Sequence, residues 1–167
     1  MRTALVTGAS GGIGQAIARE LAQRGWQVAL HYFQNQEAAQ ALEADIRRAG
    51  GAAKAYRADL REESQVEALF SQVEKDWGFV EGLVNNAGVA WKGLFTDMTL
   101  EEWHGVLDGD LTSVFLCCRR ALPPMIRRKR GSIVNVSSMW GQVGASCEAA
   151  YSAAKAGVIG LTKALAQ

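Results

Sequence analysis

The sequence predicts an α/β protein in which a parallel sheet carries helices on both faces. Short apolar runs alternate with longer segments of helical periodicity along the whole chain, a pattern that indicates βαβ crossovers. The 167 residues are 49% apolar and 21% charged, which is typical of a globular chain with a core of its own. Neither an internal repeat nor a linker interrupts the pattern, so we expect residues 1–167 to form a single domain.

Each element can be placed from its periodicity and its flanking glycines. Strands are expected at residues 3–6, 27–32, 53–58, 80–88 (ending in a turn) and 132–138. Helices are expected at residues 15–22, 36–49, 63–77, 100–128 and from 149 onward, the fourth with an interruption near Gly105 and Gly109. In the first helix, Ile13, Ile17 and Leu21 lie on one stripe.

A glycine-rich loop joins the first strand to the first helix. It reads Thr7-Gly8-Ala9-Ser10-Gly11-Gly12-Ile13-Gly14. Glycines let the backbone approach a pyrophosphate, and the start of the following helix supplies free N–H groups and a positive dipole end. The spacing Gly-x-x-x-Gly-x-Gly differs from the commoner Gly-x-Gly-x-x-Gly, and a plain strand–helix turn is the alternative interpretation.

Polar residues follow the other expected strands. Asp59 and Leu60 come after the third strand, Asn86 after the fourth, and Ser138 ends the fifth. In a parallel α/β sheet, ligands bind beyond the carboxyl ends of the strands. These positions therefore predict one binding site at this edge of the sheet, whereas Asn85 is expected to fix the turn after the fourth strand.

Tyr151 and Lys155 are four residues apart in the last expected helix, a spacing that places both on one face. An ammonium beside a phenol favours the phenolate form, so the pair can act as a general acid. Ser138, thirteen residues before the tyrosine, offers a hydroxyl that can hold a carbonyl oxygen. The alternative is that Tyr151 and Lys155 form an exposed aromatic–cation pair without a catalytic role.

Together, Thr7-Gly8-x-x-x-Gly12-Ile13-Gly14, Asn85-Asn86-Ala87-Gly88, Ser138 and Tyr151-x-x-x-Lys155 resemble the short-chain dehydrogenases/reductases. The resemblance implies a Rossmann-like, doubly wound sheet and a nicotinamide cofactor across the strand ends. It implies Tyr151 as the general acid, Lys155 on the nicotinamide ribose and Ser138 on the substrate oxygen. The cofactor-binding set that it implies is Gly8, Ser10, Gly11, Gly12, Ile13, Gly14, Asp59, Leu60, Asn86, Ala87, Gly88, Tyr151 and Lys155.

Within that family, the overall similarity is to 3-oxoacyl-[acyl-carrier-protein] reductases, which implies a small or carrier-bound ketone as substrate. Residues 137–148 instead resemble a bacterial branch that reduces a ketone on a modified lysine of elongation factor P, which makes that factor an alternative partner. Trp91 and Trp140 either wall the substrate pocket or are ordinary core or lid aromatics.

Three departures from the family pattern stand out. Asp110 occupies a position where the family has an asparagine that helps hold a water near the lysine. Aspartate serves equally if the backbone carbonyl holds the water, whereas the proton relay is impaired if the side-chain amide is needed, and the extra carboxylate would perturb Lys155 and Tyr151. Residues 32–36 contain no acid and so favour NADP over NAD, although Gly11 stands where NADP enzymes often carry a basic residue. The family's last strands and nicotinamide-covering loop have no counterpart, so we expect a truncated chain of low stability and weak activity, with the fifth strand as an open edge.

Composition and residue spacing argue against nucleic-acid-binding, metal-binding and membrane proteins. A formal net charge of +1 argues against nucleic acid, and the one basic run, residues 127–130, is expected to be a solvated helix end. Cys117, Cys118 and Cys147 are expected to be reduced core thiols, and neither His31 nor His104 has metal-site spacing, so we expect no metal. Without a signal peptide or an apolar run near ~18 residues, a cytoplasmic protein that avoids membranes is expected.

Two further alternatives remain open at this stage. The resemblance implies a homo-oligomer, and Leu111, Val114, Phe115, Leu122 and residues 158–165 offer an apolar face for it, although core packing explains them equally well. A non-catalytic dinucleotide-binding protein competes with the enzyme, because Asp110 and the missing segments disfavour turnover.

Overall fold

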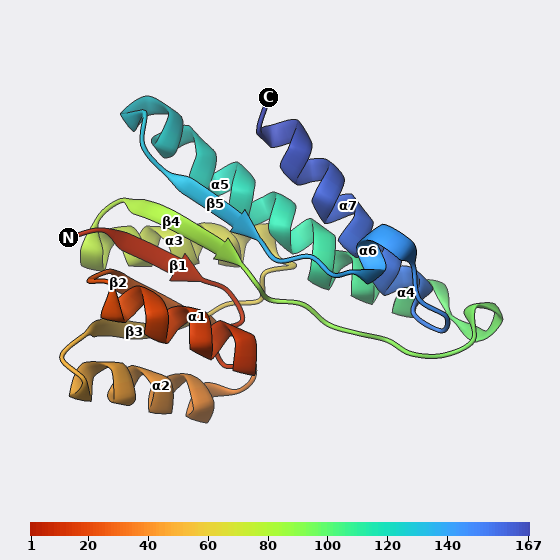
Figure 1. Cartoon of the computed structure of the whole chain (residues 1–167), viewed down its shortest axis with the longest axis horizontal. Coiled ribbons are helices and arrows are strands. Elements are labelled where there is room, and N and C mark those ends of the chain that lie inside the picture. Colours follow the sequence, from red (N-terminus) through yellow and green to blue (C-terminus); the bar gives the residue numbers. More distant parts are fainter.

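The computed structural model describes all 167 residues and contains one five-stranded parallel sheet (Figure 1). Its strands are β1 (Thr3–Val6), β2 (Gln27–Tyr32), β3 (Ala52–Arg57), β4 (Val80–Asn85) and β5 (Ser132–Asn135). They lie in the order β3-β2-β1-β4-β5. The chain therefore winds outward from β1 in both directions, and the switch point lies between β1 and β4. This confirms the predicted doubly wound Rossmann-like fold.

The helices follow the predicted alternation with the strands. They are α1 (Gly12–Gln23), α2 (Gln36–Arg48), α3 (Glu63–Trp77), α4 (Leu100–Leu107), α5 (Ser113–Arg128), α6 (Trp140–Val143) and α7 (Ala149–Leu165). The short 3-10 turn η1 (Phe95–Asp97) and the helix α6 were not predicted, because single-turn helices leave no readable periodicity.

Local capping explains several helix ends. Asn35 accepts a hydrogen bond from the Ala38 N–H at the start of α2 (3.1 Å). Thr99 and Glu102 form a reciprocal capping box at the start of α4. Beyond α5, Lys129 has a left-handed backbone with φ of 52°, which ends that helix.

Two apolar cores cover the two faces of the sheet. One joins α1 and α2 to the sheet through Ala18, Leu42, Ile46, Val6, Val28, Leu30 and Val84. The other joins α3, α5 and α7 to the opposite face through Leu5, Leu83, Leu69, Phe70, Val114, Cys117 and Val158. Consecutive strand residues thus serve opposite cores, because side chains alternate across a strand.

A π-helical turn, η2 (Asp108–Thr112), interrupts the long predicted helix between α4 and α5. The interruption expected near Gly109 is confirmed, whereas Gly105 lies inside α4. Such turns insert a residue into the helical ladder and are frequent at functional sites. Here the turn contains Asp110, whose side chain is completely buried.

The structure corrects three sequence expectations. β5 ends at Asn135, so Ser138 lies in the loop beyond the strand rather than at its end. Ile13 is 66% exposed and does not join the buried stripe of α1, because Gly14 and Ala18 form that face. Cys147 is exposed, in a loop with φ of 62°, whereas the other two cysteines are buried as expected.

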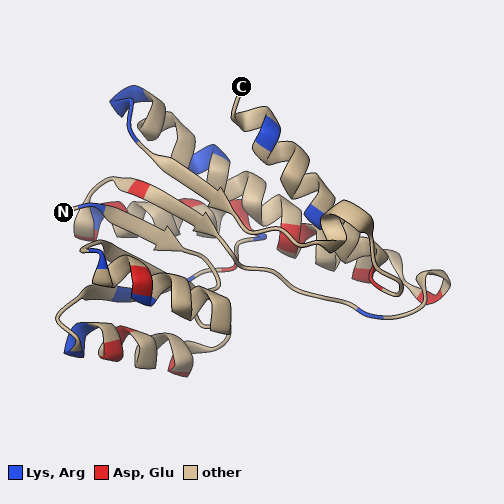
Figure 2. Cartoon of the chain, in the orientation of Figure 1, with Lys and Arg blue, Asp and Glu red and all other residues tan.

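Charged residues of both signs are interspersed over the helices and loops (Figure 2). In the basic run, Lys129 is exposed and Arg130 forms an ion pair with Glu81, as expected for a solvated helix end. β5 pairs only with β4, and Val134 is 53% exposed. None of the helices combines the length and the apolar character that a membrane span requires.

Candidate active site

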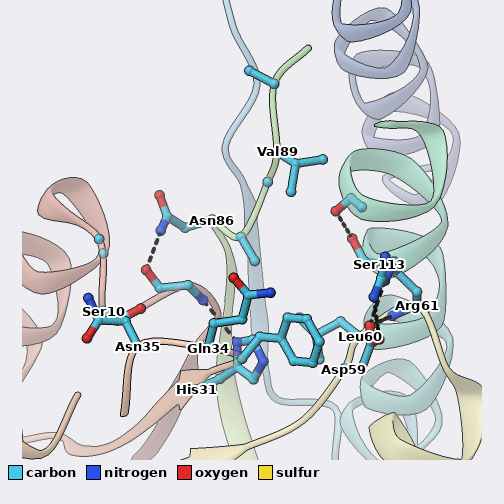
Figure 3. Close-up of a pocket in the computed structure, with 18 of the residues that line it drawn as sticks. Ser10, His31, Gln34, Asn35, Asp59, Leu60, Arg61, Asn86, Val89 and Ser113 are labelled. Atoms are coloured by element: carbon cyan, nitrogen blue, oxygen red, sulfur yellow. Dashed lines mark hydrogen bonds and ion pairs between the residues drawn. The ribbon is translucent and has the colours of Figure 1, made fainter. Parts of the chain in front are cut away.

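An open cavity of about 810 Å³ lies along the carboxyl ends of β1, β2, β3 and β4 (Figure 3). The glycine loop and α1 form one wall, and α4 and η2 form another. The residues that line it include Gly8, Ser10, Gly11, Gly12, Ile13, Gly14, Asp59, Leu60, Asn86, Ala87 and Gly88. Every residue of the predicted cofactor set except Tyr151 and Lys155 therefore borders one cavity.

The glycine loop has two positions where only glycine fits. Gly8 has φ of 63°, and a Cβ there would lie 2.8 Å from Ala87 Cα. A Cβ on Gly14 would clash with the Gly8 carbonyl and lie 2.8 Å from Asn86 Nδ2. At Gly12, by contrast, a Cβ would meet open space. The loop is thus packed tightly against the turn after β4 and open toward the cavity.

The turn after β4 is tied to this loop by hydrogen bonds. Asn86 Nδ2 donates to the carbonyls of Thr7 (3.1 Å) and Gly8 (3.2 Å). The backbone N–H groups of Asn86 and Ala87 both donate to Thr7 Oγ1, at 2.9 and 3.0 Å. Asn85 instead is buried and donates to Asn135 Oδ1 on β5 (2.8 Å). The two asparagines therefore join β4 to different neighbours.

At the other end of the cavity, Arg61 holds Asp59 through two parallel hydrogen bonds of 2.9 and 2.7 Å. This contact lowers the pKa of the Asp59 carboxyl, so that it stays charged. The guanidinium groups of Arg57 and Arg61 lie 5.7 and 5.5 Å from the Phe33 ring centroid. Phe33, Gln34, Asp59 and Arg61 line this end of the cavity, which therefore combines an aromatic ring with a paired acid and base.

Ser138, Tyr151 and Lys155 do not line the cavity, although Lys155 Nζ approaches Gly88 in its wall. Lys155 Nζ is 5.5 Å from the Tyr151 ring centroid and donates to the Val136 carbonyl (3.3 Å). Ser138 Oγ accepts a hydrogen bond from the Trp140 N–H (3.2 Å). The loop after β5 is fixed to α7, because Ser137 Oγ donates to the Lys155 carbonyl (2.8 Å).

Asp110 comes close to Lys155 at Gly88. A Cβ on Gly88 would lie 2.9 Å from Asp110 Oδ1 and 3.4 Å from Lys155 Nζ. Asp110 Oδ1 accepts the Val89 N–H (2.5 Å), whereas its buried Oδ2 has no hydrogen-bond partner. Burial raises the pKa of Asp110 and lowers the pKa of Lys155, and their mutual attraction opposes both shifts.

Sequence reasoning missed His31 as a site residue. Its imidazole lines the cavity, is 2% exposed and contacts the glycine loop. The available signal was a single polar ring in the otherwise apolar run of β2, at the carboxyl end where ligands bind. Of the two tryptophans considered, Trp91 lines the cavity and Trp140 does not.

The parallel switch-point sheet, the glycine loop and the neighbouring tyrosine–lysine pair define a dinucleotide-binding α/β protein with a candidate proton-transfer pair. Residues 2–167 match the family model described as short chain dehydrogenase. The chain therefore belongs to the short-chain dehydrogenase family.

Individual relatives are similar over nearly the whole chain. The "3-oxoacyl-[acyl-carrier-protein] reductase FabG" of Staphylococcus aureus is 42% identical over 166 residues, which cover 99% of this chain and 68% of that protein. The "3-oxoacyl-[acyl-carrier-protein] reductase" of Synechocystis sp. is 43% identical, with coverage of 99% and 67%. The crystal structure of a metagenomic short-chain oxidoreductase in complex with NADP has a TM-score of 0.94 at 39% identity and covers 98% of this chain and 74% of that one.

Proposed function

We propose that this protein reduces a ketone to an alcohol with NADPH, and that its substrate is a 3-oxoacyl group on acyl-carrier protein. The observation that carries the proposal is the meeting of two features at Gly88. A glycine loop of the phosphate-binding type forms one side of the cavity, and Lys155 Nζ, which lies 5.5 Å from the Tyr151 ring centroid, approaches Gly88 in the cavity wall. A dinucleotide in that cavity ends beside the residues that can move a proton.

The residues around the cavity fit a nicotinamide dinucleotide. The backbone at Gly12 is open to close approach, and the first N–H groups of α1 have no partner within the helix. The first turn of α1 contains no acid, so its positive dipole end is free to attract phosphate. The glycine loop from Gly8 to Gly14, with Ser10, Gly11 and Ile13, holds the pyrophosphate. Asp59 and Leu60 would hold the adenine, and Asn86, Ala87, Gly88, Tyr151 and Lys155 would hold the nicotinamide ribose.

Such a cofactor supplies a hydride when bound. The chain's own residues manage the proton. Tyr151 donates it from its phenol oxygen to the carbonyl oxygen of the substrate, and Ser138 Oγ holds that oxygen by a hydrogen bond. Lys155 would orient the ribose, and its Nζ lies 5.5 Å from the Tyr151 ring centroid. Asp110 supports the charge of Lys155, since its carboxylate is close and buried.

The cavity wall supports NADP over NAD. The residues after β2 that line it, Phe33, Gln34 and Asn35, carry no acid that would repel a 2′-phosphate. The guanidinium groups of Arg57 and Arg61 lie 5.7 and 5.5 Å from the Phe33 ring centroid, although Arg61 is paired with Asp59. The structural relative bound to NADP is consistent with this preference.

The acyl-carrier-protein substrate rests on the two reductases that are 42% and 43% identical to this chain. Residues 137–148 favour the alternative ketone, the modified lysine of elongation factor P, because this segment borders Ser138 and Tyr151. Assays with a 3-oxoacyl thioester and with the ketone-bearing factor, compared under the same conditions, decide between the two.

The Tyr151→Phe variant tests the proposed chemistry. With acetoacetyl-coenzyme A as the probe, we expect the rate of NADPH oxidation to fall by about 10²–10⁴-fold, because the proton donor is lost. NADPH binding by calorimetry should stay close to the wild-type value. Tyr32→Phe is the matched control: this buried phenol lies on β2 outside the cavity, and its loss should leave the rate unchanged. Equal rates for wild type and Tyr151→Phe would point instead to a dinucleotide-binding protein without this chemistry.

A further inference from the structure

The His31 ring joins three segments at the carboxyl edge of the sheet. It sits near the end of β2, and its Nδ1 is 3.0 Å from the Gly8 N–H of the glycine loop. Its Nε2 is 2.9 Å from the Ala58 carbonyl, just beyond β3. The His31 backbone carbonyl accepts a further hydrogen bond from the Ala9 N–H (2.9 Å). One residue therefore holds two consecutive amides of the loop.

The partners fix the tautomer of the ring. A carbonyl oxygen only accepts, so Nε2 carries the hydrogen that reaches Ala58. Nδ1 is then an acceptor, as the Gly8 N–H requires. Burial lowers the pKa of His31 to about 4, against smaller opposing effects of the Ala58 bond and the Asp59 charge. The charge of Asp59 is itself paired with Arg61. The His31 ring is therefore neutral at neutral pH.

The loop needs this support at Gly8. The residue has a left-handed backbone and is packed against Ala87, so its conformation is set within narrow limits. Without an acceptor, its partly buried N–H would lose a hydrogen bond, and the loop would favour conformations that solvate the amide. Those conformations would turn the N-terminus of α1 and the neighbouring glycines away from the phosphate-binding arrangement.

We propose that His31 is a positioning residue for the dinucleotide: its neutral ring accepts the Gly8 N–H and so holds the glycine loop ready for the pyrophosphate. The proposal rests on the proposed function, since it concerns the same cavity. His31 does not touch the reacting atoms, so its contribution belongs to cofactor affinity and not to the chemical step.

Three substitutions distinguish the effect of the two His31 hydrogen bonds from the effect of the packing of its ring. His31→Asn places an amide oxygen where Nδ1 was and can still accept the Gly8 N–H. His31→Gln places a donor near the former Nε2 and keeps the Ala58 bond alone. His31→Phe keeps the ring shape and loses both bonds. The proposal predicts that wild type binds NADPH most tightly, His31→Asn less tightly, and His31→Gln and His31→Phe least tightly. If the ring only fills space, His31→Phe should instead have the affinity nearest to wild type.

We expect the dissociation constant of NADPH to rise about tenfold in His31→Gln and His31→Phe and only a few-fold in His31→Asn. In the assay, KM for NADPH should rise while kcat is kept. Proton–nitrogen NMR of the cofactor-free protein should show the Nε2–H tautomer and slow exchange of the Gly8 amide, with that protection lost in the Gln and Phe variants.

The outcomes distinguish the two proposals. If wild type binds neither NADPH nor NADH, the proposed function fails, whereas the Gly8 amide still reports whether His31 holds the loop. If wild type binds NADPH and all three variants bind equally well, or if His31→Phe alone matches wild type, the assignment of His31 is overturned. A drop in kcat with unchanged KM would also contradict it.

Discussion

Asp110 and Lys155 are buried and both approach Gly88, where a Cβ would lie 2.9 Å from the carboxylate oxygen and 3.4 Å from the ammonium nitrogen. Because Gly88 has no side chain, the Asp110 carboxylate and the Lys155 ammonium can both lie close to it. Asp110 is fully buried and Lys155 is 5% exposed, so water screens this attraction little. The charge of the proposed proton relay therefore depends on a residue from the π-helical turn and on the absence of a side chain at position 88.

Gly88→Ala should impair this arrangement without straining the backbone, because Gly88 does not have a positive φ. The added methyl group displaces Asp110 or Lys155, and we expect kcat to fall by about tenfold to a hundredfold. Gly160→Ala, in the same helix as Lys155 with open space at its Cβ, is the control and should keep full activity. Steady-state NADPH oxidation measures both. A Gly88→Ala protein with wild-type kcat would show that the spacing of the two charges is unimportant.

In the Lys155→Met variant, the free energy of unfolding should depend on pH through protonation of the Asp110 carboxyl. Burial already raises the pKa of Asp110 above its ordinary 3.8, and loss of the lysine charge raises it further. A carboxyl group with a raised pKa adds stability at low pH, which is lost as pH rises through the folded-state pKa. We therefore expect the variant to lose about 3 kcal/mol relative to wild type at neutral pH and much less near pH 4.

Urea denaturation across this pH range measures the effect. The double variant Asp110→Asn/Lys155→Met removes the buried carboxylate and should recover most of the lost stability at neutral pH. If the single variant is equally destabilised at all pH values, packing of the lysine side chain rather than charge explains the loss.

His31 should contribute to acid sensitivity. Its pKa is lowered from 6.5 to about 4 by burial, so the unfolded chain takes up a proton at a pH where the native ring does not. Stability therefore falls as pH drops from 6.5 toward 4, by about 3 kcal/mol from this group. His31→Asn should lack this component, whereas His104→Asn, at an exposed histidine in α4, should keep it. Identical pH profiles for wild type and His31→Asn would contradict the expected shift.

Gln34→Asp should reverse the cofactor preference. Gln34 lines the cavity after β2, where an acid would repel a 2′-phosphate and bind ribose hydroxyls. We expect the ratio of NADPH to NADH affinity to fall about tenfold or more, since the two negative charges approach each other at the cavity edge. Titration calorimetry with both cofactors measures the ratio. The neutral variant Gln34→Asn is the control, and an unchanged ratio in Gln34→Asp would place the 2′-position elsewhere.

The order of strands and helices could be predicted because the spacing of apolar residues that marks each element is found within that element's own segment of the sequence. The run expected at residues 27–32 and the helical repeat at 63–77 match the observed β2 and α3, and the strand expected at 80–88 is β4, which ends at Asn85 before the turn. The glycine loop was predictable for a similar reason, since its spacing records where backbone must pack closely, as it does at Gly8 and Gly14. The i, i+4 spacing likewise predicted that Tyr151 and Lys155 share a helix face.

Tertiary structure decided what depends on contacts between distant segments. Sequence alone indicated Asp110 as a departure from a pattern, but only the packing of η2 against α7 shows that its carboxylate is buried near Lys155 with one oxygen unpaired. Likewise, His31 has no motif, and its bonds to Gly8 and Ala58 exist because parallel pairing aligns the ends of three strands. Burial and long-range hydrogen bonding are properties of the assembled sheet, so the chain determined which groups are present and the fold determined their partners and their charge.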